Sequence, residues 1–311
     1  MTAKLSRREA GKMGLMGLMG LMGPSVPLVA AVPSVPSKAA MLTRAIPSTK
    51  EQLPVIGLGT WQTFDVGGSA SARKPLLDVL ALFVQLGGRV IDSSPMYGRS
   101  ESVVGDLAAE LGLRDKLFMA TKVWTSGKRA GIEQMEDSTR KLRGKVDLMQ
   151  VHNLLDAEAH LETLKAWKAA GRIRYIGITH YTAGAYLDLA SWIKRGGIDF
   201  LQVNYSLAER EAEQRLLPLA QERGVAVLAN RPFGAGSLFR DARNKPVPAF
   251  AKDLGATSWA ELFLKFVVSH PAVTCAIPAT SKTEHLRQNM NAGRGPMPDA
   301  AMRKKIADAL L

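Results

Sequence analysis

The chain has 311 residues, 46% of them hydrophobic, and a formal net charge of +13. This length suits one large domain or two small ones, and the single cysteine, Cys275, excludes an intrachain disulfide. The charge does not indicate a nucleic-acid partner, because no basic run is interleaved with aromatic residues. Much of it lies in residues 1–50, which carry seven basic side chains and one acidic one.

The first 40 residues differ in composition from the rest of the chain. Residues 1–12 are polar and basic, and residues 13–37 pass without a charge from a Met-Gly-Leu repeat into a proline-rich stretch. This order is typical of an export signal, and Arg7-Arg8 partly resembles the twin-arginine signal. We therefore expect a signal peptide over residues 1–40, a twin-arginine translocase as partner and a periplasmic location. The alternatives are a membrane anchor, which the glycines and prolines disfavour, and a plain tail on a cytoplasmic protein.

From residue 50 onward, strand-like apolar runs alternate with segments of helical spacing. The runs begin near Val55, Arg89, Leu117, Val146, Ile173, Ile198, Val225 and Val273. Examples of the helical segments are Pro75–Leu86, Asp156–Ala170 and Glu211–Arg223. Eight such repeats over about 260 residues predict an α/β fold, the (β/α)8 TIM barrel, spanning residues 41–311.

An open doubly wound sheet is the competing architecture. It is disfavoured because Gly57-Leu58-Gly59-Thr60 lacks the third glycine of a dinucleotide fingerprint and does not open a helix. The longest interval between strands holds a loop with glycines and prolines after the seventh strand. In a barrel, this loop lies on the rim that carries the catalytic residues.

Four polar residues follow three successive predicted strands. Asp92 and Tyr97 follow the second strand, Lys122 ends the third, and His152 ends the fourth. Each alone could be structural, for instance a helix cap or a core histidine. Together at the carboxyl ends of barrel strands, they predict proton donation to a carbonyl that receives a hydride from a cofactor. Tyr97 would be the acid, Lys122 would lower its pKa, Asp92 would orient Lys122, and His152 would donate to the carbonyl oxygen.

Five segments resemble the aldo-keto reductase superfamily, and the resemblance covers about residues 50–295. They are Gly57–Trp61, Asp92–Gly98, Ala120–Lys122, Gln150–His152 and Ile277-Pro278. The resemblance implies a small carbonyl substrate and a nicotinamide cofactor, NADPH with NADH possible, bound without a Rossmann fold. We expect no metal site, and we expect a monomer. The alternative is a nucleotide-binding redox-sensing or regulatory subunit with little turnover, which the intact set of four residues disfavours.

The resemblance also implies cofactor contacts. The matching residues are Thr60, Asp92, Thr179, His180, Gln202, Thr280, Ser281, Lys282, His285, Gln288 and Asn289. Three departures stand out. Thr179-His180 stands where the family commonly has Ser-Asn, and Asn230 replaces an aromatic ring that often stacks on the nicotinamide. His285 replaces an arginine, which weakens the preference for a 2′-phosphate. Ser281 could instead simply cap the next helix.

Two tryptophans complete the predicted site. Trp61 and Trp124 follow the first and third strands and are expected to wall the substrate pocket, with simple rim packing as the alternative.

Overall fold

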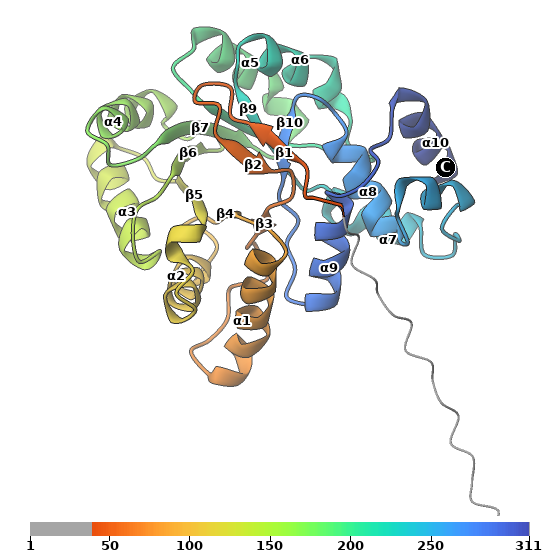
Figure 1. Cartoon of the computed structure of the whole chain (residues 1–311). Coiled ribbons are helices and arrows are strands. Elements are labelled where there is room, and N and C mark those ends of the chain that lie inside the picture. Colours follow the sequence, from red (N-terminus) through yellow and green to blue (C-terminus); the bar gives the residue numbers. More distant parts are fainter. Residues whose placement is uncertain (1–38, 311) are drawn as a thin grey trace, which may run out of the picture. The chain divides into compact units, whose positions relative to one another are not determined.

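The computed structural model describes residues 39–310, so almost all of the expected signal peptide lies outside the described residues. Eight parallel strands follow one another around a single sheet in chain order (Figure 1). They are β3 (Leu58–Gly59), β4 (Val90–Asp92), β5 (Phe118–Val123), β6 (Leu148–His152), β7 (Tyr175–His180), β8 (Phe200–Asn204), β9 (Ala226–Asn230) and β10 (Val273–Ala276). The predicted (β/α)8 barrel is confirmed, and the open sheet is excluded.

Glycines close the seam between the first and last barrel strands. Parallel bridges join Ile56 to Ala276 and Gly59 to Ala279. A Cβ on Gly59 would lie 2.7 Å from the carbonyl oxygen of Ile277, closer than packed atoms allow. The Gly57-Leu58-Gly59 sequence therefore permits close backbone approach at the seam.

Helices surround the barrel (Figure 1). The α-helices are α1 (Ala70–Gln85), α2 (Ser100–Glu110), α3 (Lys128–Lys141), α4 (Ala157–Ala169), α5 (Tyr186–Arg195), α6 (Leu216–Glu222), α7 (Ser237–Asp241), α8 (Trp259–Val268), α9 (Thr283–Ala292) and α10 (Ala300–Leu310). Short 3-10 turns are η1 (Arg114–Lys116), η2 (Ala183–Ala185), η3 (Glu211–Gln214), η4 (Gly234–Gly236) and η5 (Ala249–Leu254). In the described part of the chain, no helix is both long and apolar enough to cross a bilayer.

Three predicted segments differ in detail. The first helix begins at Ala70 rather than Pro75, because the Ser69 hydroxyl accepts from the backbone of Ala72 and caps it. The expected helix Glu211–Arg223 is split into η3 and α6, since Pro218 has no N–H and its ring would clash with the carbonyl four residues earlier. The predicted loop after β9 contains the short helices α7 and η5.

Alternation of side chains along the strands fills the barrel interior. Inward positions near the start of each strand are apolar and form one buried cluster, with Val90, Phe118, Leu148 and Phe200 among its members. Further toward the carboxyl ends, several inward positions are polar and buried, among them Asp92, Lys122, Gln150 and Gln202. Every second side chain of a strand points into the barrel, so the same row of inward positions forms the core near the start of the strand and the polar site near its end.

A β-hairpin covers the other end of the barrel. Strands β1 (Thr43–Ala45) and β2 (Gln52–Pro54) pair antiparallel, and they cross the barrel in Figure 1. Ile46 and Leu53 of this hairpin belong to the same buried cluster as the inward strand residues. The hairpin therefore seals the amino-terminal end of the barrel and leaves the carboxyl end for the site.

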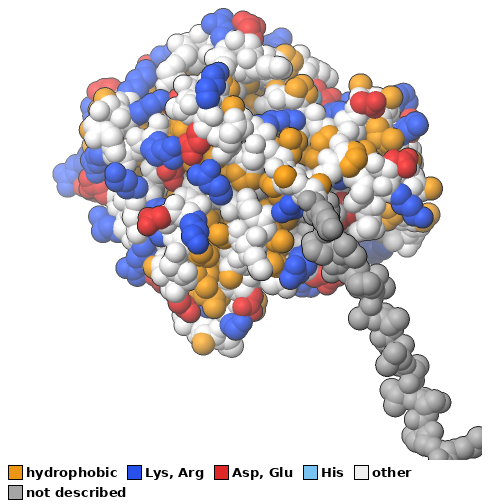
Figure 2. Space-filling model, in the orientation of Figure 1, with side chains coloured by type: hydrophobic (Ala, Val, Ile, Leu, Met, Phe, Trp, Pro, Cys, Tyr) orange, Lys and Arg blue, Asp and Glu red, His pale blue; other side chains and the backbone are white. Residues whose placement is uncertain are grey.

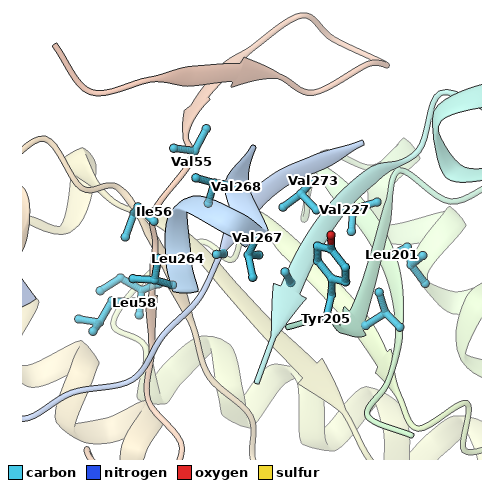
Figure 3. Packing of buried hydrophobic residues seen from close by; sticks show 14 of the residues in the cluster. Val55, Ile56, Leu58, Leu201, Tyr205, Val227, Leu264, Val267, Val268 and Val273 are labelled. Carbon is cyan, nitrogen blue, oxygen red and sulfur yellow. The ribbon is translucent and has the colours of Figure 1, made fainter. Parts of the chain in front are cut away.

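The outer core lies between the strands and the helices. Val267 of α8 lies near Val227 and Val273 of the last two strands (Figure 3). Leu264 and Val268 of the same helix lie near the segment that carries Val55 and Ile56. On the face seen in Figure 2, lysine and arginine side chains are interspersed with acidic ones. Surface ion pairs of the described residues include Lys74 with Asp78 on α1.

Candidate active site

A buried ion pair lies at the carboxyl ends of β4 and β5. The Lys122 ammonium donates to Asp92 Oδ2 at 2.7 Å and to the carbonyl oxygen of Ser93 at 2.7 Å. Both side chains are almost fully buried. Burial alone would lower the pKa of Lys122, but the charge of Asp92 and the neighbouring Tyr97 outweigh burial and raise it. Lys122 is therefore a fixed cation in the barrel mouth.

Two glutamines hold the Asp92 carboxylate in place. Gln150 of β6 donates to Oδ1 at 3.2 Å, and Gln202 of β8 donates to Oδ2 at 3.3 Å. With Lys122, three donors from three strands converge on one carboxylate. Side chains of the barrel strands thus fix the position of the Asp92 carboxylate, and Asp92 in turn orients the Lys122 ammonium.

Tyr97 lies on the turn that follows β4. Its backbone N–H donates to the carbonyl of Ser94 at 3.0 Å, and the Lys122 ammonium lies 5.0 Å from its ring centroid. Burial raises the pKa of the Tyr97 phenol, and the positive charge of Lys122 only partly offsets this. The expected lowering of the Tyr97 pKa is therefore wrong in its net direction, because the burial effect is larger. The phenol stays protonated at neutral pH and can donate.

His152 faces the same space from the end of β6. Its ring centroid is 6.0 Å from that of Tyr97 and 6.4 Å from that of Trp124. Burial, with the charge of Lys122 adding to it, lowers the pKa of His152 to about 3. The imidazole is therefore neutral at physiological pH, and one ring nitrogen carries a proton. Nδ1 lies 3.1 Å from the Ser94 hydroxyl.

Large apolar side chains are exposed around this mouth. Trp61 and Trp124, the predicted pocket walls, are 52% and 41% exposed directly after β3 and β5. Met96 and Tyr181, which sequence reasoning did not single out, are similarly exposed after β4 and β7. An apolar rim therefore surrounds a polar floor, an arrangement suited to small organic ligands.

The residues matched to nicotinamide contacts lie on the adjacent strand ends. Thr60 is buried, and its hydroxyl lies 3.0 Å from both the Asp92 carbonyl oxygen and the Ser93 hydroxyl, which ties it to β4. Thr179 is buried at the end of β7. Next to it, His180 stacks on the ring of Tyr181.

Unpaired amide groups mark a position for a hydrogen-bonding ligand. The side-chain oxygens of Gln202 and Asn230 are buried, and neither has a partner among residues 39–310. Buried polar atoms without partners are costly unless a ligand or water satisfies them. These two acceptors fit the carboxamide N–H groups of a nicotinamide. Asn230 thus offers a hydrogen bond where an aromatic ring would stack.

The segment matched to adenosine binding lies between β10 and α9. Thr280 accepts from the backbone of Lys282, and α9 begins after Lys282 without any side-chain cap. The alternative role of Ser281 as helix cap is therefore wrong. Lys282 and His285 are exposed and make no ion pair within the described range. Gln288 is half-buried and Asn289 is buried in the same helix. The uncapped backbone N–H groups at the start of α9, together with the Lys282 side chain beside them, are suited to bind a phosphate.

The structure thus brings Asp92, Tyr97, Lys122 and His152 into one barrel mouth. The residues matched to cofactor contacts lie on the strands and on the segments that follow them, with Gln288 and Asn289 inside α9. Three polar contacts were not predicted from the sequence. One is the bond from Gln202 to Asp92, because Gln202 was assigned only to the cofactor. The bond from Gln150 to Asp92 and the contact of Ser94 with His152 each join residues 58 positions apart. No local pattern indicates such pairs. Among residues 39–310, no cluster of three metal-ligating side chains is found.

Comparison with known proteins gives consistent matches. The family model described as "Aldo/keto reductase family" matches residues 55–306. Methylglyoxal reductase YeaE of Escherichia coli (strain K12) is 34% identical over 250 residues, which cover 76% of this chain and 84% of that protein.

Solved structures agree with this match. An aldo/keto reductase from Klebsiella pneumoniae in complex with NADP and acetate is 29% identical, with a TM-score of 0.70, and covers 83% of this chain and 91% of its own. An aldo-keto reductase from the same organism in complex with NADPH is 28% identical, with a TM-score of 0.71, and covers 86% and 94%.

Proposed function

The chain belongs to the aldo/keto reductase family, and we propose that it reduces small aldehydes or ketones to alcohols with a hydride from NADPH. One observation carries the proposal. A buried lysine, fixed at 2.7 Å from Asp92, lies beneath a protonated tyrosine and beside a neutral histidine at the open end of a barrel. This set of groups can deliver a proton to an oxygen and stabilise the charge left behind.

Tyr97 Oη would donate its proton to the carbonyl oxygen, and a bound nicotinamide cofactor would supply the hydride that the carbonyl carbon needs. Lys122 Nζ stabilises the phenolate that results, because its positive charge lies next to the ring. Asp92 keeps Lys122 charged and oriented. His152 donates a hydrogen bond to the same carbonyl oxygen and does not transfer a proton, since its low pKa keeps it neutral.

Two sets of polar groups support the proposed cofactor, one for its nicotinamide and one for its 2′-phosphate. Gln202 and Asn230 offer unpaired acceptors to a nicotinamide carboxamide. Lys282 offers a free ammonium next to the uncapped start of α9, where the 2′-phosphate of NADPH is expected. The two Klebsiella pneumoniae reductases that resemble this chain were solved with NADP and NADPH. We propose NADPH as the preferred cofactor, with NADH weaker.

The direct test is oxidation of NADPH by the purified protein with a panel of simple carbonyls. Methylglyoxal is the natural first member, because the Escherichia coli relative is named as its reductase. Carbonyl-dependent loss of NADPH absorbance is expected. Tight NADPH binding with no turnover on any member would instead support a redox-sensing or regulatory subunit.

We further propose that residues 1–40 direct export of the folded protein to the periplasm. Support comes from the sequence alone: a basic start with Arg7-Arg8, and then a weakly apolar segment. A nicotinamide cofactor is made in the cytosol, so a protein that needs it would have to fold around it before export. Replacing Arg7-Arg8 with Lys-Lys should keep the precursor in the cytoplasm, and processing is expected between Ala30 and Ala40. Wild-type protein found wholly in the cytosol with Met1 retained would refute this.

A further inference from the structure

Ser94 is hydrogen-bonded to both residues whose side chains would face the substrate oxygen, to His152 through the ring and to Tyr97 through the backbone. It is fully buried two residues after Asp92, and its hydroxyl lies 3.1 Å from His152 Nδ1. Its carbonyl accepts from the backbone N–H of Tyr97 at 3.0 Å and so closes the turn that carries the phenol. Ser94 therefore links the turn that carries Tyr97 to the His152 imidazole at the end of β6.

The direction of the Ser94–His152 hydrogen bond follows from the partners of the hydroxyl. Ser94 Oγ also accepts from the backbone N–H of Met96 at 3.4 Å, and that group can only donate. Within residues 39–310, Nδ1 of His152 is thus the only acceptor that the Ser94 proton can reach. A buried hydroxyl proton without an acceptor is costly, so Ser94 donates and Nδ1 accepts.

The other nitrogen of His152 is left to carry the ring proton. A neutral imidazole has one donor nitrogen and one acceptor nitrogen, and the bond made by one fixes the role of the other. Nε2 has no partner in the described part of the chain, and it is not among the enclosed polar atoms. An N–H at this position is free to meet a ligand in the mouth.

We propose that Ser94 is a positioning residue that fixes His152 as its Nε2–H tautomer, so that His152 can donate to the carbonyl oxygen of the substrate. This proposal deepens the reductase function and rests on it for its catalytic consequence. Without the Ser94 donor, nothing in the described structure holds Nδ1 unprotonated. The imidazole then populates both tautomers, and only one of them can donate toward the substrate.

The tautomer can be read without any substrate. Long-range ¹H–¹⁵N correlation spectra of protein labelled with ¹⁵N-histidine distinguish protonated from unprotonated ring nitrogens, and loss of a signal in His152→Gln assigns the residue. At pH 7 we expect His152 to be protonated at Nε2 only. Ser94→Ala should show a second population protonated at Nδ1. Protonation of wild-type Nδ1, or an unchanged pattern in Ser94→Ala, would overturn the proposal.

Kinetics give the second readout. Ser94→Ala should lower kcat/KM roughly two- to tenfold, the effect of one hydrogen bond, with most of the loss in kcat and no change in the Kd of NADPH. Ser206→Ala is the matched control, because its buried hydroxyl also accepts from a backbone N–H in a loop after a barrel strand. The control should leave the His152 spectrum unchanged.

The two readouts separate the possible failures. If the wild-type protein reduces no carbonyl while His152 carries its proton at Nε2, the proposed reductase function fails and the role of Ser94 in setting the tautomer stands. If turnover is normal but the tautomer does not depend on Ser94, the positioning role fails alone.

Discussion

Replacing Asp92 with asparagine removes the negative charge from the buried ion pair while it keeps the shape of the side chain. At the observed 2.7 Å and an effective dielectric constant of about 20, the attraction between Asp92 and Lys122 is about 6 kcal/mol before desolvation is counted. Removing one partner of a buried pair typically costs about 3–5 kcal/mol. The N–H2 group of the new amide would also face a donor in either orientation, because Gln150 donates to Oδ1 while Lys122 and Gln202 donate to Oδ2. We therefore expect Asp92→Asn to lower the free energy of unfolding by an amount near the upper end of this range.

The same change should alter the pH dependence of turnover. In the wild type, Asp92 and Tyr97 raise the pKa of Lys122 against the effect of burial. Without Asp92, burial dominates and the pKa of Lys122 falls, so the ammonium loses its proton as pH rises through this lower value. In Asp92→Asn, kcat at pH 7 should therefore be about 10- to 100-fold lower and should recover partly as pH falls.

Urea unfolding and kcat from pH 5 to 9 measure both effects. Asp78→Asn is the control, because its pair with Lys74 is solvent-exposed on α1 and should be worth no more than about 0.5 kcal/mol. An Asp92→Asn protein within about 1 kcal/mol of wild type and with an unchanged pH profile would refute the role given to the buried pair.

Other changes test the surroundings of the site. Burial raises the pKa of Glu101 in the folded protein. The contribution of Glu101 to the free energy of unfolding is therefore full below its pKa in the unfolded chain, and it is lost as pH rises through its pKa in the folded protein, with a slope of at most about 1.4 kcal/mol per pH unit. Glu101→Gln should flatten this decrease of stability with pH, measured as urea midpoints. Lys282→Ala should weaken NADPH binding by about 10-fold or more and leave NADH binding unchanged in fluorescence titrations, and an equal loss for both would contradict its assignment to the 2′-phosphate. Gly105→Ala should destabilise the protein by about 1–3 kcal/mol although alanine favours helices, because the new Cβ would lie 2.1 Å from the Lys141 carbonyl oxygen. Gly68→Ala is the control, because a Cβ there meets nothing within 4 Å. Thermal melts that show Gly105→Ala to be stabilising would mean that α2 and α3 are not so closely packed.

The barrel could be predicted from sequence because each strand is a short apolar run that ends in polar residues. The predicted start of each run lies within three residues of the observed strand, from Val55 before β3 to Val273 at β10. The inward alternation that fills the core also places Lys122 and His152 at the strand ends. The order of the fold and the location of the site thus follow from local pattern and from the closure of parallel strands.

Other features depend on contacts that no local pattern contains. The net rise in the Tyr97 pKa depends on how deeply the ring is buried, and this requires the packed structure. The hydrogen bond between Ser94 and His152 joins two strand ends 58 residues apart, and either residue alone has an ordinary local role. The break before α6 could have been predicted, because Pro218 marks it in the sequence.

The central claim is that Tyr97 is the proton donor of a carbonyl reductase, and Tyr97→Phe tests it most directly. This variant keeps the ring beside Lys122 and removes only the hydroxyl. With NADPH and the best substrate of the wild-type protein, kcat should fall about 10²- to 10⁴-fold, while the Kd of NADPH should stay within about twofold. A Tyr97→Phe protein whose kcat lies within a few-fold of wild type would contradict the role of Tyr97 and with it the mechanism proposed for this site.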